Sequence, residues 1–322
     1  MADHQVSRRS FLQGAALAAG ASMLGTQRML VAADDDPYGG FRMGLQSYSL
    51  RAFTLDEALQ HTRTLGVGYW EAFPGHIKLN TLPAHIDEHK AKLEEAGVSL
   101  IAYGVLGFNE NETKAREAFD FAQAMKLKSI SANPQKNAAT FDLLDKLVEE
   151  YGIPIAIHNH GPGHTYDKVD DVLAMVKDRH PKIGACVDTG HYIRSDEDPV
   201  EVLEKLGDRV FGVHLKDAKT IRDPEEIARL SKELPKNRAN QLQREGKVFT
   251  ILGEGELDVV GCLRVLRKQN FDNCLSLEYE ENAQNPLSDI EVCLKTVREA
   301  VKKLGVRSQE SGVRSQESGD RR

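Results

Sequence analysis

Between residues 41 and 304 of this 322-residue chain, short runs of strand-forming residues alternate strictly with longer segments of helical periodicity. The pattern repeats eight times, and its long connections make neighbouring strands parallel. We therefore predict an α/β protein with a single closed (β/α)8 TIM barrel. An open doubly wound sheet is the alternative, but it would normally carry a glycine-rich phosphate loop where this chain has Gln46-Ser47-Tyr48. The expected strands are 42–48, 67–73, 98–103, 127–132, 153–158, 183–187, 209–215 and 274–279. The expected helices are 55–65, 83–96, 110–126, 138–151, 168–179, 199–206, 258–269 and 287–303.

Residues 217–250 interrupt the alternation between the seventh predicted strand and its helix. The segment is polar and largely helical in character. We expect a helical insertion after strand seven, on the face of the barrel where active sites lie. A lid, a contact within a homo-oligomer and a passive surface excursion all remain open as its role.

Both ends of the chain are expected to lie outside the barrel domain, residues 41–304. Residues 1–33 combine Arg8-Arg9, a weakly apolar Ala/Gly-rich stretch and a small-residue site, as a twin-arginine signal peptide does. This signal predicts export of the folded protein to the periplasm. At the other end a polar seven-residue segment is copied once, which predicts a disordered tail over 305–322.

The charge balance argues against two classes of partner. The chain has 42 Lys and Arg residues against 49 Asp and Glu residues, a net charge of −7, so nucleic acid and anionic membranes are not expected partners. No run of 18 apolar residues follows residue 40, so no membrane span is expected once the signal is removed. The four cysteines form no C-x-x-C pair and are expected to be free, mostly buried thiols.

Imidazole and carboxylate side chains collect at the predicted C-terminal ends of strands five to eight. Parallel strands bring these ends together at one mouth of a barrel, so we expect the side chains to converge. Each histidine alone is more often a hydrogen-bonded structural residue, but four such groups on successive strands favour a functional site. Two imidazoles and two carboxylates suit one divalent ion, with Mn²⁺, Zn²⁺, Co²⁺ and Mg²⁺ as candidates. The predicted ligands are His158, Asp188, His214 and Glu278.

The segments that carry these residues resemble the xylose isomerase-like barrel superfamily, the sugar phosphate isomerase/epimerase group, and in particular its exported IHNHGP-type proteins. The resemblance implies one divalent ion, Mn²⁺ first, held by Glu, Asp, His and Glu. Asp188, His214 and Glu278 match this set, whereas His158 stands where the family has its first Glu. That departure weakens a symmetrical two-carboxylate epimerase mechanism. The segments are GLQSYSLR (44–51), IAIHNHGPG (155–163), CVDTGH (186–191), GVHLKD (212–217), LGEGELD (252–258) and LSLEYE (275–280).

The resemblance implies an exported metal-dependent enzyme acting on a small sugar or keto-sugar. The expected reaction is isomerisation or epimerisation, in which a proton next to a carbonyl is abstracted and one divalent ion holds the enediolate. A lyase or hydrolase acting on 3-keto glycosides is the alternative, and a non-catalytic, metal-assisted sugar-binding barrel is a further one. Endonuclease IV shares the superfamily, but Tyr103-Gly104-Val105 offers none of the extra metal ligands that it needs after strand three.

Proton transfer needs groups beyond the metal ligands. Glu278 can act as ligand and base at once, as its family counterpart is thought to do. His160 shares a strand face with His158 and is the best free base, although an outer hydrogen bond that orients a ligand is an equal alternative. Lys216 shares a face with His214 and is expected to hold a developing oxyanion. The expected substrate-binding residues are Glu71, His191 and Glu280.

Overall fold

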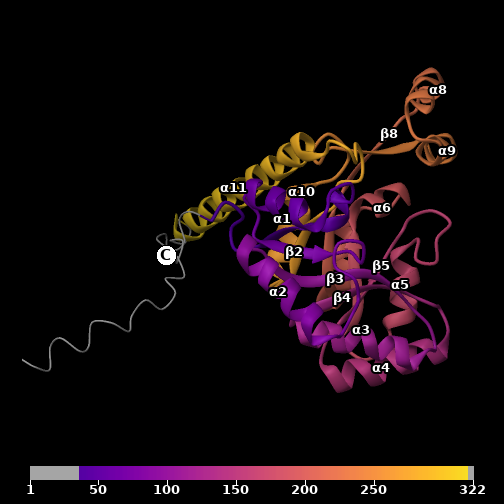
Figure 1. Cartoon of the computed structure of the whole chain (residues 1–322). Helices are drawn as coiled ribbons and strands as arrows, with labels where there is room; N and C mark the ends of the chain where they lie inside the picture. The colour runs from indigo at the N-terminus through magenta and orange to yellow at the C-terminus, as the bar shows by residue number, and fades with distance from the viewer. Residues whose placement is uncertain (1–35, 318–322) are drawn as a thin grey trace, which may run out of the picture. The chain divides into compact units, whose positions relative to one another are not determined.

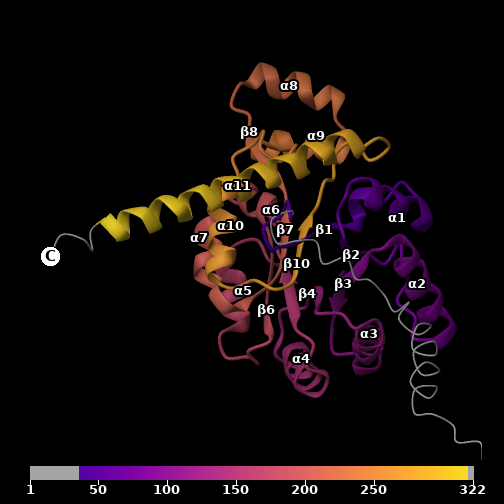
Figure 2. The same ribbon diagram turned by 90° about the vertical axis from the view of Figure 1, so that its left-hand side faces the viewer.

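The computed structural model describes residues 36–317, so the proposed signal peptide lies outside the described residues. From Tyr38 onward, eight parallel strands close into a barrel in the order β1-β10-β7-β6-β5-β4-β3-β2 (Figures 1 and 2). The predicted (β/α)8 barrel is confirmed. The barrel strands are β1 (Arg42–Gln46), β2 (Tyr69–Ala72), β3 (Ser99–Phe108), β4 (Ser129–Pro134), β5 (Ile155–His158), β6 (Ile183–Asp188), β7 (Val210–Leu215) and β10 (Cys274–Leu277).

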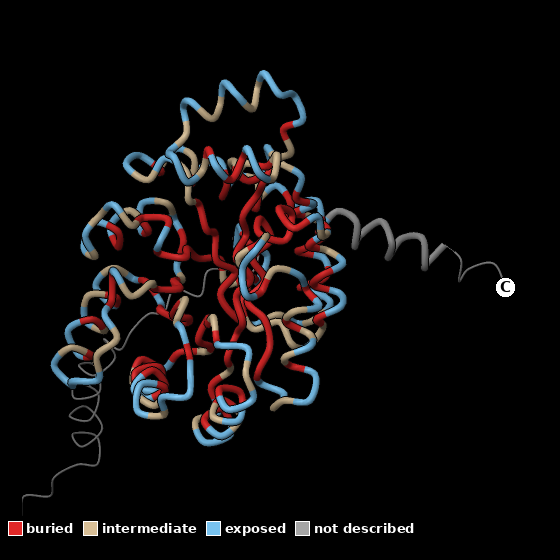
Figure 3. The backbone as a smooth tube through the Cα atoms, turned by 90° about the vertical axis from the view of Figure 1, so that its right-hand side faces the viewer, coloured by how far each residue is buried: buried red, intermediate tan, exposed pale blue. Residues whose placement is uncertain are grey.

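Helices surround the strands, and their ends follow the expected capping chemistry. Thr54 and Glu57 form a capping box at the start of α1, and Asp198 caps α7 ahead of Pro199. Buried residues gather on the strands and on the helix faces toward them (Figure 3). These helices are α1 (Leu55–Thr64), α2 (Pro83–Ala96), α3 (Glu112–Met125), α4 (Ala138–Tyr151), α5 (Val169–Val176), α7 (Pro199–Leu206) and α10 (Val259–Lys268).

The structure adds two helical segments that the periodicity did not predict. A short helix, α6 (Thr189–Arg194), begins directly where β6 ends, and its six residues are too few to show a helical repeat. The last helix, α11 (Leu287–Glu317), continues past Gly305 into the segment for which a disordered tail is predicted. Most residues of the copied segment tolerate a helix well, and its glycines only weaken it.

The insertion is a two-stranded antiparallel ribbon that carries two helices. Strands β8 (Asp217–Thr220) and β9 (Lys247–Thr250) pair with each other, and α8 (Pro224–Glu233) and α9 (Lys236–Glu245) lie between them in sequence. The segment projects from the barrel beyond α6 (Figure 1). Asp217 anchors the base of the ribbon, because its carboxylate accepts backbone hydrogen bonds from Gly253, Gly255 and Leu257.

The described residues include no helix long and apolar enough to cross a membrane. All four cysteines are free and buried, as predicted.

Candidate active site

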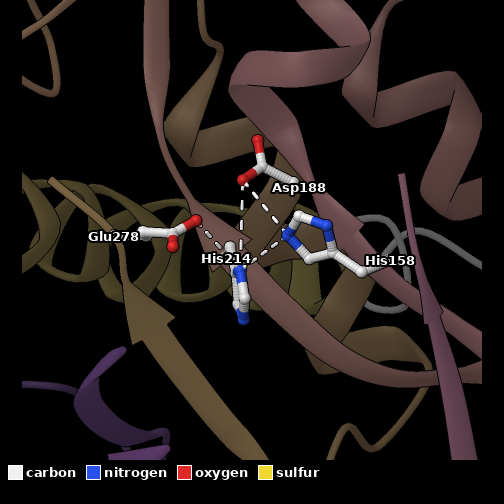
Figure 4. Close-up of side chains that lie close together, drawn as sticks. All are labelled: His158, Asp188, His214 and Glu278. Atoms are coloured by element: carbon white, nitrogen blue, oxygen red, sulfur yellow. Dashed lines mark hydrogen bonds and ion pairs between the residues drawn. The ribbon is translucent and has the colours of Figure 1, made fainter. Parts of the chain in front are cut away.

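The four predicted metal ligands meet inside one mouth of the barrel (Figure 4). His158 ends β5, Asp188 ends β6, His214 lies on β7, and Glu278 directly follows β10. Asp188 and His214 are register partners on neighbouring strands, which fixes their separation. One donor atom from each of the four lies within 4.8 Å of the other three.

The donor atoms of the four residues lie close together, and their lone pairs point toward the same small region. His158 Nε2 lies 3.0 Å from His214 Nδ1, which in turn lies 3.2 Å from Glu278 Oε2. Asp188 Oδ2 is 3.6 Å from His158 Nε2, and among the described residues it accepts no hydrogen bond of good geometry. Buried acceptors crowded in this way attract a proton or a metal cation.

Lys216 supplies positive charge beside the cluster. Its ammonium lies 3.0 Å from Asp188 Oδ2, 2.7 Å from Glu278 Oε2 and 2.5 Å from a Glu280 oxygen. Burial lowers the pKa of Lys216, but these three carboxylates raise it above its usual value, so the side chain stays cationic. The ammonium is thus surrounded by carboxylates, and the oxyanion contact expected for Lys216 stays a prediction.

Glu71 does not reach the cavity where substrate contact was expected. The side chain is fully buried and accepts a hydrogen bond from His214 Nε2 at 2.9 Å and another from Ser276 Oγ at 3.0 Å. Donation from Nε2 leaves His214 Nδ1 as the atom that faces Asp188 and Glu278. Burial lowers the pKa of His214, yet Cys186, Glu71 and Glu278 raise it well above its usual range, so the site favours positive charge.

Replacing Glu71 by glutamine is expected to weaken metal binding by roughly 10- to 100-fold, the usual cost of losing a partner that orients a ligand histidine. Glutamine can offer His214 an amide donor where the carboxylate accepted, and it lacks the negative charge. Metal titration of the chelator-treated protein measures the change. Wild-type affinity in Glu71→Gln would remove Glu71 from this role.

Hydrogen bonds and close packing around Asp188 explain why Asn159 and Gly190 stand between the functional side chains. Asp188 Oδ1 accepts the His191 backbone N–H at 2.8 Å and caps α6, which leaves Oδ2 for the cluster. Asn159 exchanges two hydrogen bonds with the Asp188 backbone and ties β5 to β6. A Cβ at Gly190 would lie 2.6 Å from Lys216 Cγ, so the close approach of α6 requires glycine there. Asn159 was missed as a site residue because its side chain points away from the face of His158 and His160.

A cavity of about 370 Å³ opens beside the cluster and has two chemically different walls. One wall carries imidazoles and carboxylates, and the other is formed largely by apolar side chains beside the amide of Gln46. The apolar wall could not be predicted from the sequence, although GLQSYSLR (44–51) contributes Gln46 and Tyr48 to it. The polar wall comprises His158, His160, His191, Glu278 and Glu280, and the other comprises Gln46, Tyr48, Phe73, Pro74, Gly104 and Val105.

His160 lines the cavity without a side-chain hydrogen bond to another described residue. Its ring packs edge-on against that of His158, with centroids 4.5 Å apart. Burial, and then the neighbouring His158, lower the pKa of His160 to about 3. The imidazole is therefore neutral at pH 7, the state in which it accepts a proton. His76 and His164, two loop histidines near this face, do not line the cavity.

His191 and Glu280 reach the cavity as predicted, and each is held from behind by an arginine. Arg194 donates to His191 Nδ1 at 2.8 Å, so the neutral ring carries its proton on Nε2. Arg238 binds Glu280 at 2.6 Å.

A family model for xylose isomerase-like TIM barrels matches residues 59–297. The chain belongs to this family.

Individual relatives of this xylose isomerase-like chain include dehydratases. An inosose dehydratase of Clostridium beijerinckii is 30% identical over 143 residues, which cover 43% of this chain and 44% of that protein. An inosose dehydratase of Bacillus velezensis is 31% identical over 148 residues, covering 45% and 47%. The chain thus spans about half the length of the curated relatives it matches.

Solved structures share the fold over most of the chain. The probable 3-DHS dehydratase AsbF of Bacillus anthracis superposes with a TM-score of 0.60 at 16% identity, covering 80% of this chain and 98% of that one. The zinc-bound IolI protein has a TM-score of 0.60 at 18% identity, covering 82% and 99%. At these identities the likeness shows the fold alone.

Proposed function

We propose that this protein is a metal-dependent enzyme that abstracts a proton next to the carbonyl of an uncharged polyhydroxylated ketone, and that it acts chiefly as a lyase. The observation that carries the proposal is the convergence of two imidazoles and two carboxylates beside a cavity lined by a free, neutral imidazole, His160. The match to inosose dehydratases supports the lyase direction.

The donor set fits one divalent cation. His158, Asp188, His214 and Glu278 would hold it, and mixed nitrogen and oxygen donors suit Mn²⁺, Zn²⁺ or Co²⁺. Asp188 Oδ2, buried and without a well-aligned donor, supports the assignment. A divalent ion bound here would act as a Lewis acid on a substrate oxygen.

The charges around the cavity favour an uncharged substrate. Glu278 and Glu280 contribute carboxylates to its wall, and the nearby cations Lys216 and Arg238 are already paired with them. A phosphate or carboxylate group would meet negative charge here. The apolar wall with Tyr48 and Phe73 offers a surface for the C–H face of a sugar or cyclitol ring. Export by the twin-arginine route, which we also propose, agrees with this choice, because sugar phosphates are mainly cytoplasmic.

Two side chains of the protein act on the substrate, His160 and His191. His160 accepts the proton from the carbon next to the carbonyl, and His191 Nε2–H binds a hydroxyl group. In elimination, the C–H electron pair forms the new double bond and the bond to the β-oxygen breaks with its own pair. That oxygen then takes the proton from the His160 imidazolium. Return of the proton to the former carbonyl carbon, with transfer of the hydroxyl proton to the former carbonyl oxygen, would instead give isomerisation, the second candidate.

Inversion at a single carbon is disfavoured in this site. A lone base returns a proton to the face from which it came, and inversion needs a second acid on the opposite face. His158 stands where the family has its first Glu, and the Oε2 atom of the remaining glutamate, Glu278, is engaged by His214 and Lys216. His160 is therefore the base best placed to act, with elimination as its main outcome.

Incubation in D₂O with matched free and phosphorylated ketoses, and with a 3-keto glucoside, tests the proposal. We expect one metal ion per chain, deuterium exchange into an uncharged ketone and an unsaturated product detected by NMR. Exchange without elimination would assign the isomerase reaction. Binding without exchange would identify the sugar-binding barrel instead, and preference for a phosphorylated ketose would overturn the substrate assignment.

A further inference from the structure

Three side chains of the insertion contact residues that line or support the cavity. These side chains are Arg238 and Glu245 of α9 and Phe249 of β9. We propose that the insertion is a working part of the active site, and that Arg238 and Glu245 are positioning residues for Glu280 and His191. The catalytic part of this inference rests on the proposed function.

Arg238 holds Glu280 from the side of the insertion. Arg238 Nη2 lies 2.6 Å from Glu280 Oε2, while the other Glu280 oxygen pairs with Lys216 at 2.5 Å. Both carboxylate oxygens are thus fixed, one from the insertion and one from the barrel. Removing Arg238 would leave Glu280 anchored at one oxygen and free to rotate within the cavity wall.

Glu245 reaches His191 through Arg194. The carboxylate of Glu245 receives two hydrogen bonds from Arg194, at 2.8 and 2.9 Å, and both side chains are about 95% buried. The remaining Arg194 nitrogen donates to His191 Nδ1 at 2.8 Å. A bidentate pair of this kind fixes the plane of the guanidinium, and the guanidinium in turn fixes the tautomer of His191.

Phe249 packs among the cations of this network. Its ring centroid lies 5.0 Å from Lys216 Nζ, 5.3 Å from the Arg194 guanidinium carbon and 4.7 Å from that of Arg238. The same ring meets His191 edge-on at 5.2 Å. The face of an aromatic ring attracts cations, so one buried side chain of β9 helps to order groups from both barrel and insertion.

These contacts argue against the alternative that the insertion is a passive surface excursion. A passive ribbon would meet the barrel through exposed, interchangeable contacts, whereas Glu245 is buried against Arg194 and Arg238 is mostly buried against Glu280. The insertion therefore sets the hydrogen-bonding state of His191 and the orientation of Glu280. The two effects act on different cavity residues and are testable separately.

Arg238→Ala is the first test, with Arg229→Ala on α8 as its matched control. Within residues 36–317, Arg229 has Glu233 as its one ion-pair partner, across an exposed turn of the same insertion. We expect Arg238→Ala to lower kcat about 100-fold, the cost of misplacing a group in the site by roughly 1 Å, with metal content unchanged. Added guanidinium is expected to restore part of the activity, while Arg229→Ala behaves as wild type.

Glu245→Gln provides a second test that needs no activity. Nitrogen-15 NMR of the imidazoles in the metal-loaded protein reports which His191 nitrogen carries the proton. We expect a single Nε2–H form in the wild type and a mixture in Glu245→Gln. An unchanged His191 spectrum in a folded Glu245→Gln protein overturns the positioning role even if the wild type is active.

The two tests fail in different ways. If the wild type turns over and Arg238→Ala matches Arg229→Ala in kcat, the positioning role of Arg238 is wrong. If no substrate reacts with the wild type, the proposed function fails and the NMR result alone decides whether the insertion fixes His191.

Discussion

Alanine at Asp188 or Glu278 is expected to reduce bound metal from about one ion per chain to a trace. The loss should exceed the roughly 100-fold upper range for a partner that only orients a ligand, because a charged donor is removed from the cluster itself. Asp188 Oδ2 lies among the donor atoms without a well-aligned hydrogen bond, so its removal leaves His158 and His214 with one carboxylate fewer. Elemental analysis of protein purified without chelator gives the ratio directly.

Asp188 has a second role, because its Oδ1 atom caps α6. The control variant must therefore lose a comparable helix cap. Loss of such a cap costs about 1 kcal/mol of stability on its own. Asp198 caps α7 in the same way and lies outside the donor cluster, so Asp198→Ala provides the matched loss. Metal content near one ion per chain in both Asp188→Ala and Glu278→Ala would contradict the assignment.

The positions of the four donor residues could be predicted because topology determines them. Once eight strand–helix units are recognised, the C-terminal ends of the strands must meet, and His158, Asp188 and Glu278 lie at such ends. Residue spacing then placed His160 and Glu280 on the same wall as their partners two positions earlier. These predictions needed only strand order and the two-residue period.

The position of the Glu71 side chain could not be predicted in this way. Its strand was correctly predicted, and β2 ends one residue after it, at Ala72. The side chain nevertheless is fully buried against His214 and Ser276 and does not line the cavity. Depth along the axis depends on strand tilt and on the size of the side chains above, which period and strand ends do not encode.

The apolar wall and the insertion contacts depend on tertiary packing. Phe73 and Tyr48 meet edge to face with centroids 5.3 Å apart, although 25 positions separate them in sequence. Arg238 lies on a polar helix whose periodicity gives no sign of the carboxylate that it binds. Only the folding of the β8–β9 ribbon over α6 reveals the partner.

Replacing His160 by glutamine is expected to abolish solvent-deuterium exchange into substrate while leaving metal content unchanged. Glutamine keeps a polar side chain of similar reach but cannot accept a proton near neutral pH. General base catalysis contributes roughly 10²- to 10⁴-fold to the rate of a reaction, so the rate of deuterium exchange should decrease by a factor of this size. Because the pKa of His160 is lowered to about 3, the imidazole is a weak base, and abstraction depends on a strongly polarised carbonyl.

His164 provides the matched control, because it lies in the same loop with its ring 5.6 Å from that of His160 and does not line the cavity. His164→Gln should exchange deuterium at the wild-type rate. Loss of metal in His160→Gln would mean that His160 supports a ligand instead, although the structure gives it no side-chain hydrogen bond to any of the four. Unchanged exchange with metal retained would remove His160 from the mechanism. Glu278 would then have to serve as the base, and its strong contacts with Lys216 and His214 would have to loosen when substrate binds.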